Sequence, residues 1–305
     1  MVRVKNSANT KFINWSIFTA LALIWGSSFI LMKRGLDVYT SDEVAAMRIL
    51  IAFLFLSPLI VRHLKKELWP HWKGFLGMGL FGNFIPAFLF TKAETGISSS
   101  LAGILNSLTP LFALLLGLVI FKTRTDFIRV VGLVIGFLGA VGLMVVGKGV
   151  DITTNLSYGS YILIATLSYG LSVNIIKSQL GKVNSITATV WAMTFIGPMA
   201  GVYLFGFTDF ATRISSYPHA FESLGYVSIL AIFGTAISVI LFNVLIKNTN
   251  VLFASSVTYL IPIVAIGWGA VDGDKIGLLH FLWIGFILLG VFLVNKKKAS
   301  KVLSE

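Results

Sequence analysis

The sequence predicts an all-α membrane protein in which ten transmembrane helices form two inverted five-helix repeats. Three observations predict this fold class. Of the 305 residues, 56% are hydrophobic and only 12% are charged, and the mean hydropathy of +0.90 is too high for a water-soluble domain of this size. The chain also divides into ten apolar stretches joined by short polar connections. Finally, the two halves share a sequence pattern, as a duplicated unit would.

Most of the apolar stretches approach the length of about 20 residues that a helix needs to cross a bilayer. In chain order, we expect membrane spans at residues 15–32, 44–61, 73–90, 98–121, 127–146, 158–176, 186–207, 224–246, 251–271 and 278–294. The longest polar connection, 208–222, contains Pro218 and is expected to form a turn at the membrane interface. The first span has no small-residue cleavage site after it, so we interpret it as an uncleaved helix.

The basic residues predict the orientation of the spans. Lysine and arginine are concentrated at both ends of the chain and in alternate connections, for example at Arg62 and Lys65. Because basic residues accumulate on the cytoplasmic side, both termini are expected in the cytoplasm and the protein in an inner or plasma membrane. Five spans per half is an odd number, so the second half enters the membrane from the opposite side. The expected repeats, residues 13–148 and 155–295, are therefore inverted.

The fourth and ninth spans are predicted to be interrupted helices. Pro110 and Pro262 lie 152 residues apart, and this offset aligns the two spans without a gap. Because proline lacks an N–H, the carbonyl groups of Asn106 and Thr258 lose their helical partners and are expected to be left free inside the membrane. In many secondary transporters, such interrupted helices form the substrate site near the bilayer midplane. We therefore predict that Asn106 and Thr258 line a substrate cavity; the alternative is that each helix is simply kinked.

Other polar and aromatic residues lie on spans that could border the same cavity. A site for a zwitterionic or neutral solute needs amides and hydroxyls that fix its orientation, and ring faces that cover its apolar part. The candidates are Asn83, Asn243, Tyr169, Tyr259, Trp25 and Asn174. Alternatively, such residues hydrogen-bond between helices without binding a ligand, and this is the favoured interpretation for Asn174.

Three charged residues are candidates for gating or coupling. Arg48 lies about two turns inside the second span, where an unpaired guanidinium is costly. It could form a gate salt bridge or bind a substrate carboxylate; alternatively, it extends to Glu43 or to a lipid phosphate. Lys33 and Glu94, at the ends of the first and third spans, could form an outer gate or anchor the helices at the interface.

Several functions are disfavoured by residues that the chain lacks. It has no cysteine and only four scattered histidines, so no metal site and no cofactor are expected. The basic residues follow membrane topology, so no nucleic-acid partner is expected. The spans contain neither a mid-membrane carboxylate, which a proton-coupled cation exporter needs, nor the basic cluster of a phosphate exchanger. Amino acids or similar zwitterionic or neutral metabolites are therefore the favoured substrates.

An ordered set of motifs resembles the EamA family of the drug/metabolite transporter superfamily over nearly the whole chain. The set comprises Ile-Trp-Gly-Ser-Ser-Phe at 24–29, Arg48, the stretch 96–110 and glycine-rich fifth and tenth spans. The resemblance implies a ten-helix carrier that moves small metabolites by alternating access. The family usually has a glutamate just after spans four and nine, whereas this chain has Lys122-Thr123-Arg124 and Asp272-Gly273-Asp274 there.

We therefore expect an exporter of small metabolites. Two other functions stay open, an enzyme and a flippase, each acting on a lipid-linked substrate. A membrane enzyme would need clustered carboxylates or paired histidines, which the sequence lacks. The glycines of the fifth span, Gly132, Gly136, Gly139 and Gly142, form a small-residue face that suits close packing within the bundle or a dimer interface.

Overall fold

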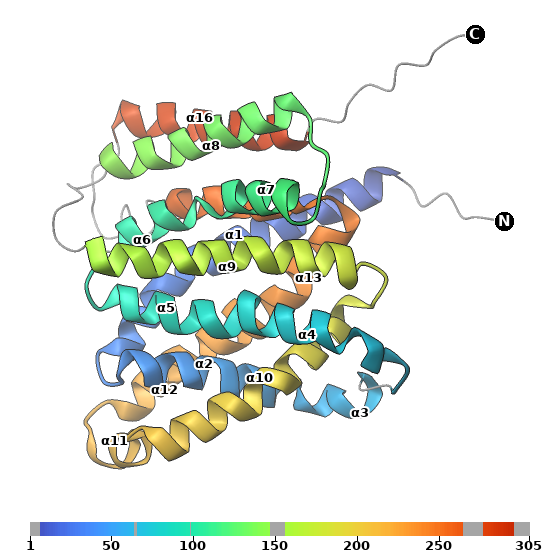
Figure 1. Cartoon of the computed structure of the whole chain (residues 1–305). Coiled ribbons are helices and arrows are strands. Elements are labelled where there is room, and N and C mark those ends of the chain that lie inside the picture. Colours follow the sequence, from blue (N-terminus) through green and yellow to red (C-terminus); the bar gives the residue numbers. More distant parts are fainter. Residues whose placement is uncertain (1–6, 64–65, 98, 147–155, 265–276, 296–305) are drawn as a thin grey trace, which may run out of the picture.

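The computed structural model describes residues 7–63, 66–97, 99–146, 156–264 and 277–295, and these residues contain helices and no β-strand. The long helices run side by side as a bundle (Figure 1). In the first half of the chain, the bounds are α1 Ser7–Leu36, α2 Ser41–Leu56, η1 Ser57–Leu59, α3 Ile60–His63, η2 Lys66–His71, α4 Trp72–Gly79, η3 Leu80–Phe84, α5 Ile85–Glu94, α6 Ser99–Asn106, α7 Thr109–Val119 and α8 Phe127–Val146. In the second half, they are α9 Leu156–Gln179, α10 Ser185–Phe207, α11 Phe210–Ser216, α12 Ala220–Ala231, η4 Ile232–Ile237, α13 Ser238–Asn248, α14 Val251–Ser255, η5 Ser256–Leu260 and α16 Leu278–Asn295.

Six helices among the described residues are long and apolar enough to cross a membrane. They are Thr10–Leu36, Ser41–His63, Trp69–Glu94, Ser157–Gln179, Ser185–Phe207 and Ala220–Asn248. Four shorter apolar helices accompany them, at Thr109–Val119, Phe127–Gly142, Val251–Val264 and Leu278–Val294. Large apolar side chains such as Phe205 and Phe292 are exposed on the outside, as a lipid environment requires. The six long helices and this apolar surface support the prediction of a helical membrane protein.

Helix α8, the fifth predicted span, packs its small-residue face against α16. The two helices lie side by side at one edge of the bundle (Figure 1). A Cβ atom added to Gly142 would lie 2.3 Å from the ring of Trp283, and one added to Gly290 would lie 2.5 Å from the Cα of Gly136. The two backbones can approach this closely only because these positions are glycines. The glycine face thus packs within the bundle, as one of the two sequence interpretations proposed.

The offset of 152 residues recurs in the secondary structure. Helix α6 begins at Ser99 and α14 at Val251, and after each break the helix resumes at Thr109 and at Ile261. Two π-helical segments, η3 and η4, also begin at this offset, at Leu80 and at Ile232. A π segment has one more residue per turn than an α-helix and is common at functional sites. The two halves thus share their irregular backbone as well as their sequence pattern.

Several sequence expectations are refined by the structure or lie outside the described residues. The connection 208–222 contains a short helix, α11, that ends before Pro218, rather than only a turn. The first described residues of α1 and the last of α16 lie at the same end of the bundle (Figure 1). The end of the ninth predicted span, residues 265–271, and the acidic pair Asp272 and Asp274 lie outside the described residues, as does Lys65.

Candidate functional site

The site is built around the two interrupted helices. Between α6 and α7 the regular hydrogen bonding stops at Asn106, and the hydroxyl of Thr109 donates to the Asn106 carbonyl at 2.8 Å and to its side-chain oxygen at 3.3 Å. In the second copy, a 3₁₀ turn replaces the α-helix from Ser256, and the backbone N–H of Ile261 donates to the Thr258 carbonyl. The expectation that these two carbonyls are left free is therefore wrong, because local donors satisfy both. The side chains of Asn106 and Thr258 nevertheless face a shared space.

That space is a cavity of about 110 Å³ enclosed by residues from both halves of the chain. Since one buried water needs about 10–15 Å³ by this kind of measure, the cavity has room for a small solute. The sequence candidates that line it are Trp25, Arg48, Asn83, Asn106, Tyr169, Asn243 and Thr258. Apolar residues, including Phe29, Phe90 and Phe242, cover much of the remaining wall. A wall of this composition suits a solute with an apolar body and a few polar groups.

The π segments bring polar groups to the cavity wall. Segment η3 contributes Gly82 and Asn83, and η4 contributes Gly234. The indole N–H of Trp25 donates to the Gly234 carbonyl at 3.2 Å, which ties the first helix to the irregular turn in the second half. The indole N–H is therefore occupied, and Trp25 offers its ring face to a ligand, held edge-on against Phe242 with ring centroids 5.2 Å apart.

The amide groups around the cavity differ in how far the protein already satisfies them. The Asn243 side chain is buried, and its nitrogen donates to the Thr189 hydroxyl at 2.9 Å, while its oxygen has no partner among the described residues. The Asn83 nitrogen makes one long contact, 3.4 Å, to the Met78 carbonyl. Asn83 is thus less constrained by the protein than Asn243, so its amide is the more available of the two for a ligand.

Arg48 projects from α2 into the same cavity. Its Nε donates to the hydroxyl of Thr235 at 2.7 Å, across to the π segment η4. The expected alternative, an extension of Arg48 towards Glu43, is not what the structure shows, because Glu43 pairs with Arg213 at 3.2 Å instead. Arg48 forms no ion pair with any described residue.

Four of the sequence candidates are not among the residues that line the cavity. The Tyr259 hydroxyl donates to the Leu133 carbonyl at 2.9 Å and thereby joins η5 to α8. The Asn174 nitrogen donates to the carbonyls of Ala113 and Gly170, the interhelical role favoured for it above. Lys33 is exposed near the end of α1, and Glu94 is half-buried at the end of α5.

The sequence reasoning missed three serines and a threonine that the structure places in the cavity wall, namely Ser28, Ser172, Ser255 and Thr109. Ser28 and Ser172 line it from α1 and α9. For these two the signal was present, since an offset of 144 residues aligns them along with Gly26 and Gly170. Each of these glycines admits close contact with an interrupted helix: a Cβ at Gly26 would lie 2.6 Å from Val264, and one at Gly170 would lie 2.9 Å from Ala113.

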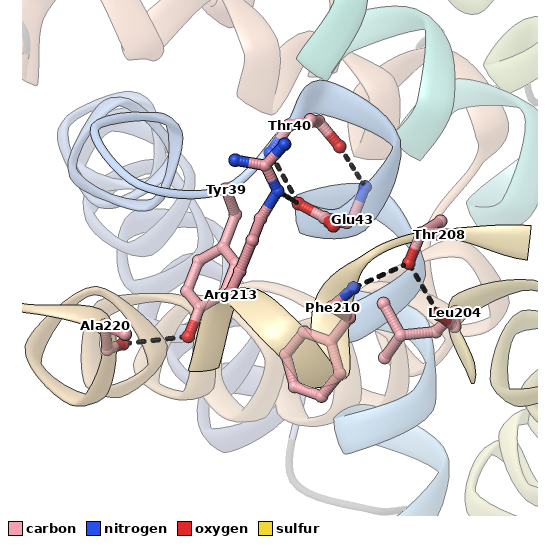
Figure 2. Close-up of polar contacts among 8 residues, drawn as sticks. All are labelled: Tyr39, Thr40, Glu43, Leu204, Thr208, Phe210, Arg213 and Ala220. Carbon is pink, nitrogen blue, oxygen red and sulfur yellow. Dashed lines mark hydrogen bonds and ion pairs between the residues drawn. The ribbon is translucent and has the colours of Figure 1, made fainter. Parts of the chain in front are cut away.

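One end of the bundle is fastened by a cluster that we name the clasp, formed by Tyr39, Thr40, Glu43, Arg213 and Ala220 (Figure 2). The Glu43 carboxylate, only 1% exposed, accepts from the Thr40 backbone N–H at 2.8 Å and pairs with Arg213 at 3.2 Å. The Tyr39 hydroxyl donates to the Ala220 carbonyl at 2.9 Å. Burial, and the nearby Glu43 carboxylate, raise the pKa of the Tyr39 phenol. The clasp therefore joins the α1–α2 turn to the α11–α12 region.

Tyr39 and Glu43 occupy fixed positions because of their local sequence. Thr40 caps the start of α2, since its hydroxyl accepts from the Glu43 backbone N–H at 3.3 Å while the Glu43 side chain accepts from the backbone N–H of Thr40. This reciprocal capping box fixes the orientation of the carboxylate. Thr208, by accepting from the Phe210 backbone N–H at 3.3 Å, starts the turn that leads to α11 and Arg213 (Figure 2).

Comparison with known proteins agrees with this architecture. A protein of Archaeoglobus fulgidus named an uncharacterized transporter is 24% identical, over 93% of this chain and 99% of its own length. The Escherichia coli protein YedA, named an uncharacterized inner membrane transporter, is 27% identical over 92% of this chain and 89% of its own. A solved crystal structure superposes with a TM-score of 0.68 at 18% identity, over 94% of this chain and 96% of that chain, and so shares the fold.

A family match covers both halves of the chain. The model described as the EamA-like transporter family matches residues 14–145 and, a second time, residues 157–296. The two matched stretches contain both interrupted helices, both π segments and the residues that line the cavity. The sequence motifs at 24–29 and 96–110 fall within the first stretch. This chain belongs to the EamA-like transporter family and is a membrane transporter.

Proposed function

We propose that this transporter is a secondary active carrier that exports small metabolites, such as amino acids or similar zwitterionic or neutral solutes, by alternating access. The observation that carries the proposal is the cavity of about 110 Å³, in which amides, hydroxyls and aromatic rings from both halves surround one space. Asn106 and Thr258, on the two interrupted helices, lie 152 residues apart in the sequence and both line this cavity. No cofactor enters this mechanism.

In this proposal, ten spans form two inverted repeats, residues 13–148 and 155–295, with both termini in the cytoplasm. The shared offset of the helix breaks and of the π segments supports the repeat. Each repeat rocks against the other around the cavity, and the breaks near Pro110 and Pro262 let the helices bend. Lys33 and Glu94, near the C-terminal ends of α1 and α5, form an outer gate in this proposal.

The first test is a binding screen on the purified full-length protein. A ligand that binds the folded state raises the melting temperature by mass action. We expect stabilisation by at least one amino acid or related zwitterion among a panel that also contains organic cations and phosphorylated metabolites. Stabilisation only by phosphorylated or lipid-linked compounds would refute the proposed substrate class.

The second test removes polar groups from the cavity wall. Asn106→Leu deletes an amide, and Thr258→Val replaces a hydroxyl by a methyl group of nearly the same size. We expect both variants to fold and to lose transport in proteoliposomes, because a bound solute would lose a hydrogen-bond partner in a water-poor site. Thr166→Val is the matched control, since Thr166 is equally buried and bonds only within its own helix, away from the cavity wall. Normal transport in both cavity variants would refute the site.

A further inference from the structure

We infer that the transported solute carries a carboxylate and that Arg48 binds it, while the solute's amino group, where it has one, is not bound by an opposite charge. This inference rests on the proposed carrier function and specifies its substrate. Among the residues that line the cavity, Arg48 is the one with a charged side chain, and none is an aspartate or a glutamate. The cavity therefore has a net positive charge.

The guanidinium of Arg48 is only partly satisfied by the protein. Its Nε donates to the Thr235 hydroxyl at 2.7 Å, and this is the one hydrogen bond that its side chain makes to the described residues. An arginine has five N–H donors, so the four on the two terminal nitrogens have no acceptor among the described residues. A guanidinium that is withdrawn from water and unpaired is costly, so a group that supplies the missing acceptors would stabilise it.

The contact with Thr235 also orients the guanidinium. Thr235 is buried in the π segment η4 and accepts from Nε, the nitrogen nearest the side-chain stem. The bond occupies Nε and leaves the donors of the two terminal nitrogens for a ligand in the cavity that Arg48 lines. A carboxylate has two oxygens with the spacing of this planar fork and binds it through two parallel hydrogen bonds. Neither a hydroxyl nor an amide can match both donors and the charge at once.

The remaining lining supports an anionic head group joined to an apolar body. The hydroxyls of Tyr169 and Ser172 line the same cavity and are further donors that a carboxylate could use. The rings of Phe29, Phe90 and Phe242 line the cavity as well. An ammonium group would find amide and hydroxyl oxygens but no carboxylate among these residues. The carboxylate is therefore required for recognition, and the amine is dispensable.

The test uses two sets of four related compounds, which vary the two head groups independently. The first set is leucine, 4-methylpentanoate, leucinamide and 4-methylpentanamide; the second is phenylalanine, 3-phenylpropanoate, phenylalaninamide and 3-phenylpropanamide. Affinities are measured on the purified full-length protein by thermal shift titration. We expect the carboxylate members of at least one set to bind, with or without the amine, and the corresponding amides to bind about tenfold or more weakly, as the loss of a charge-assisted hydrogen bond predicts.

Arg48→Gln should lower the affinity for the carboxylates about tenfold or more and leave the weak affinity for the amides unchanged. Arg48→Lys keeps the positive charge but lacks the planar guanidinium, so it should retain part of the preference for carboxylates over amides. This variant replaces Arg48→Gln in the test if Arg48→Gln does not fold. Arg129→Gln is the matched control, because Arg129 is also a half-buried arginine but does not line the cavity. The control should keep the full preference for carboxylates.

Three results would overturn the inference: amides that bind as tightly as the acids, a preference that survives Arg48→Gln, or a panel in which no carboxylate binds. Each is distinguishable from failure of the carrier proposal. If amides or amines bind, and Asn106→Leu abolishes that binding, the cavity is the transport site and only the role of Arg48 is refuted. If the acids bind with undiminished affinity in Asn106→Leu and Thr258→Val, the proposed cavity is refuted.

Discussion

Under the proposed alternating-access mechanism, breaking the clasp should open one end of the transporter. Arg213→Gln removes the cation that pairs with Glu43 at 3.2 Å. Exposed ion pairs contribute about 0–1 kcal/mol, whereas breaking a buried pair costs about 3–5 kcal/mol. Here the Glu43 side chain is 1% exposed and that of Arg213 is 24% exposed, so about 2 kcal/mol is a reasonable value between the two. That energy corresponds to a change of about 30-fold in the equilibrium between the closed and open arrangements.

Thiol labelling measures this change directly, because the chain has no cysteine of its own. Ser28→Cys places one thiol in the cavity wall. Under the proposed alternating-access mechanism, Arg213→Gln should raise the rate at which a membrane-impermeant maleimide labels Cys at position 28 from the clasp side, by up to about 30-fold. The control is Arg34→Gln, since Arg34 and Asp37 are 3.8 Å apart and both are more than half exposed. That pair contributes little, so the rate should not change.

The effects of removing Glu43 and Arg213 should not add, because the two residues form one ion pair. Glu43→Gln should accelerate labelling to a similar extent as Arg213→Gln, and the double variant should be no faster than either single variant, because both remove the same interaction. An unchanged labelling rate in a folded Arg213→Gln protein would refute the idea that the clasp holds this end closed. Accelerations that simply multiply in the double variant would show that Glu43 and Arg213 do not act as a pair.

Two further predictions concern stability. Gly142→Ala should destabilise the folded protein by about 1–3 kcal/mol, because its Cβ would collide with the Trp283 ring at 2.3 Å. The control is Gly225→Ala, which should not lower the melting temperature because no atom lies within 4 Å of the added Cβ. Equal melting temperatures of the two variants would contradict the predicted collision with Trp283. Folding raises the pKa of Tyr39 above its ordinary value of 10.0. The stabilisation that the protonated phenol gives to the folded state is therefore fully present below pH 10.0 and is lost as the pH rises through the folded-state pKa. Wild type should therefore lose more stability than Tyr39→Phe between pH 9 and about 11 in thermal unfolding, and parallel losses would contradict the assignment.

The sequence was most informative where chemistry restricts the backbone. Proline at positions 110 and 262 predicted both helix breaks, because a missing N–H acts locally. The prolines did not predict that the Thr109 hydroxyl would donate to the Asn106 carbonyl, because this bond depends on the side-chain rotamer of Thr109. Likewise, mid-span polar residues predicted a polar interior, but not which of them share a cavity. Asn174 and Asn243 look alike in sequence, yet the side chain of Asn174 bonds across to Ala113.

Contacts between distant segments were beyond the reach of pattern reasoning. Glu43 has basic residues available at many positions in the sequence, and only the packing of α11 against the α1–α2 turn selects Arg213 (Figure 2). The Thr235 partner of Arg48 was missed for a similar reason, since the two residues lie 187 positions apart. The π segments gave no local signal, because an extra residue in one turn leaves the apolar composition of a span unchanged.

The π segments also set the rotational register of one helix in each half of the transporter. A helix that loses the extra residue of its π turn must rotate everything beyond that turn by about 100°, the angle between successive α-helical residues. In the third span, such a rotation would carry Phe90 away from the cavity wall while leaving α4 in place. Single-residue deletions within Leu80–Phe84 or Ile232–Ile237 would therefore alter which side chains the solute meets without shortening either helix by a full turn. The residue inserted in each π segment thus sets the rotation of α5 relative to α4 and of α13 relative to α12.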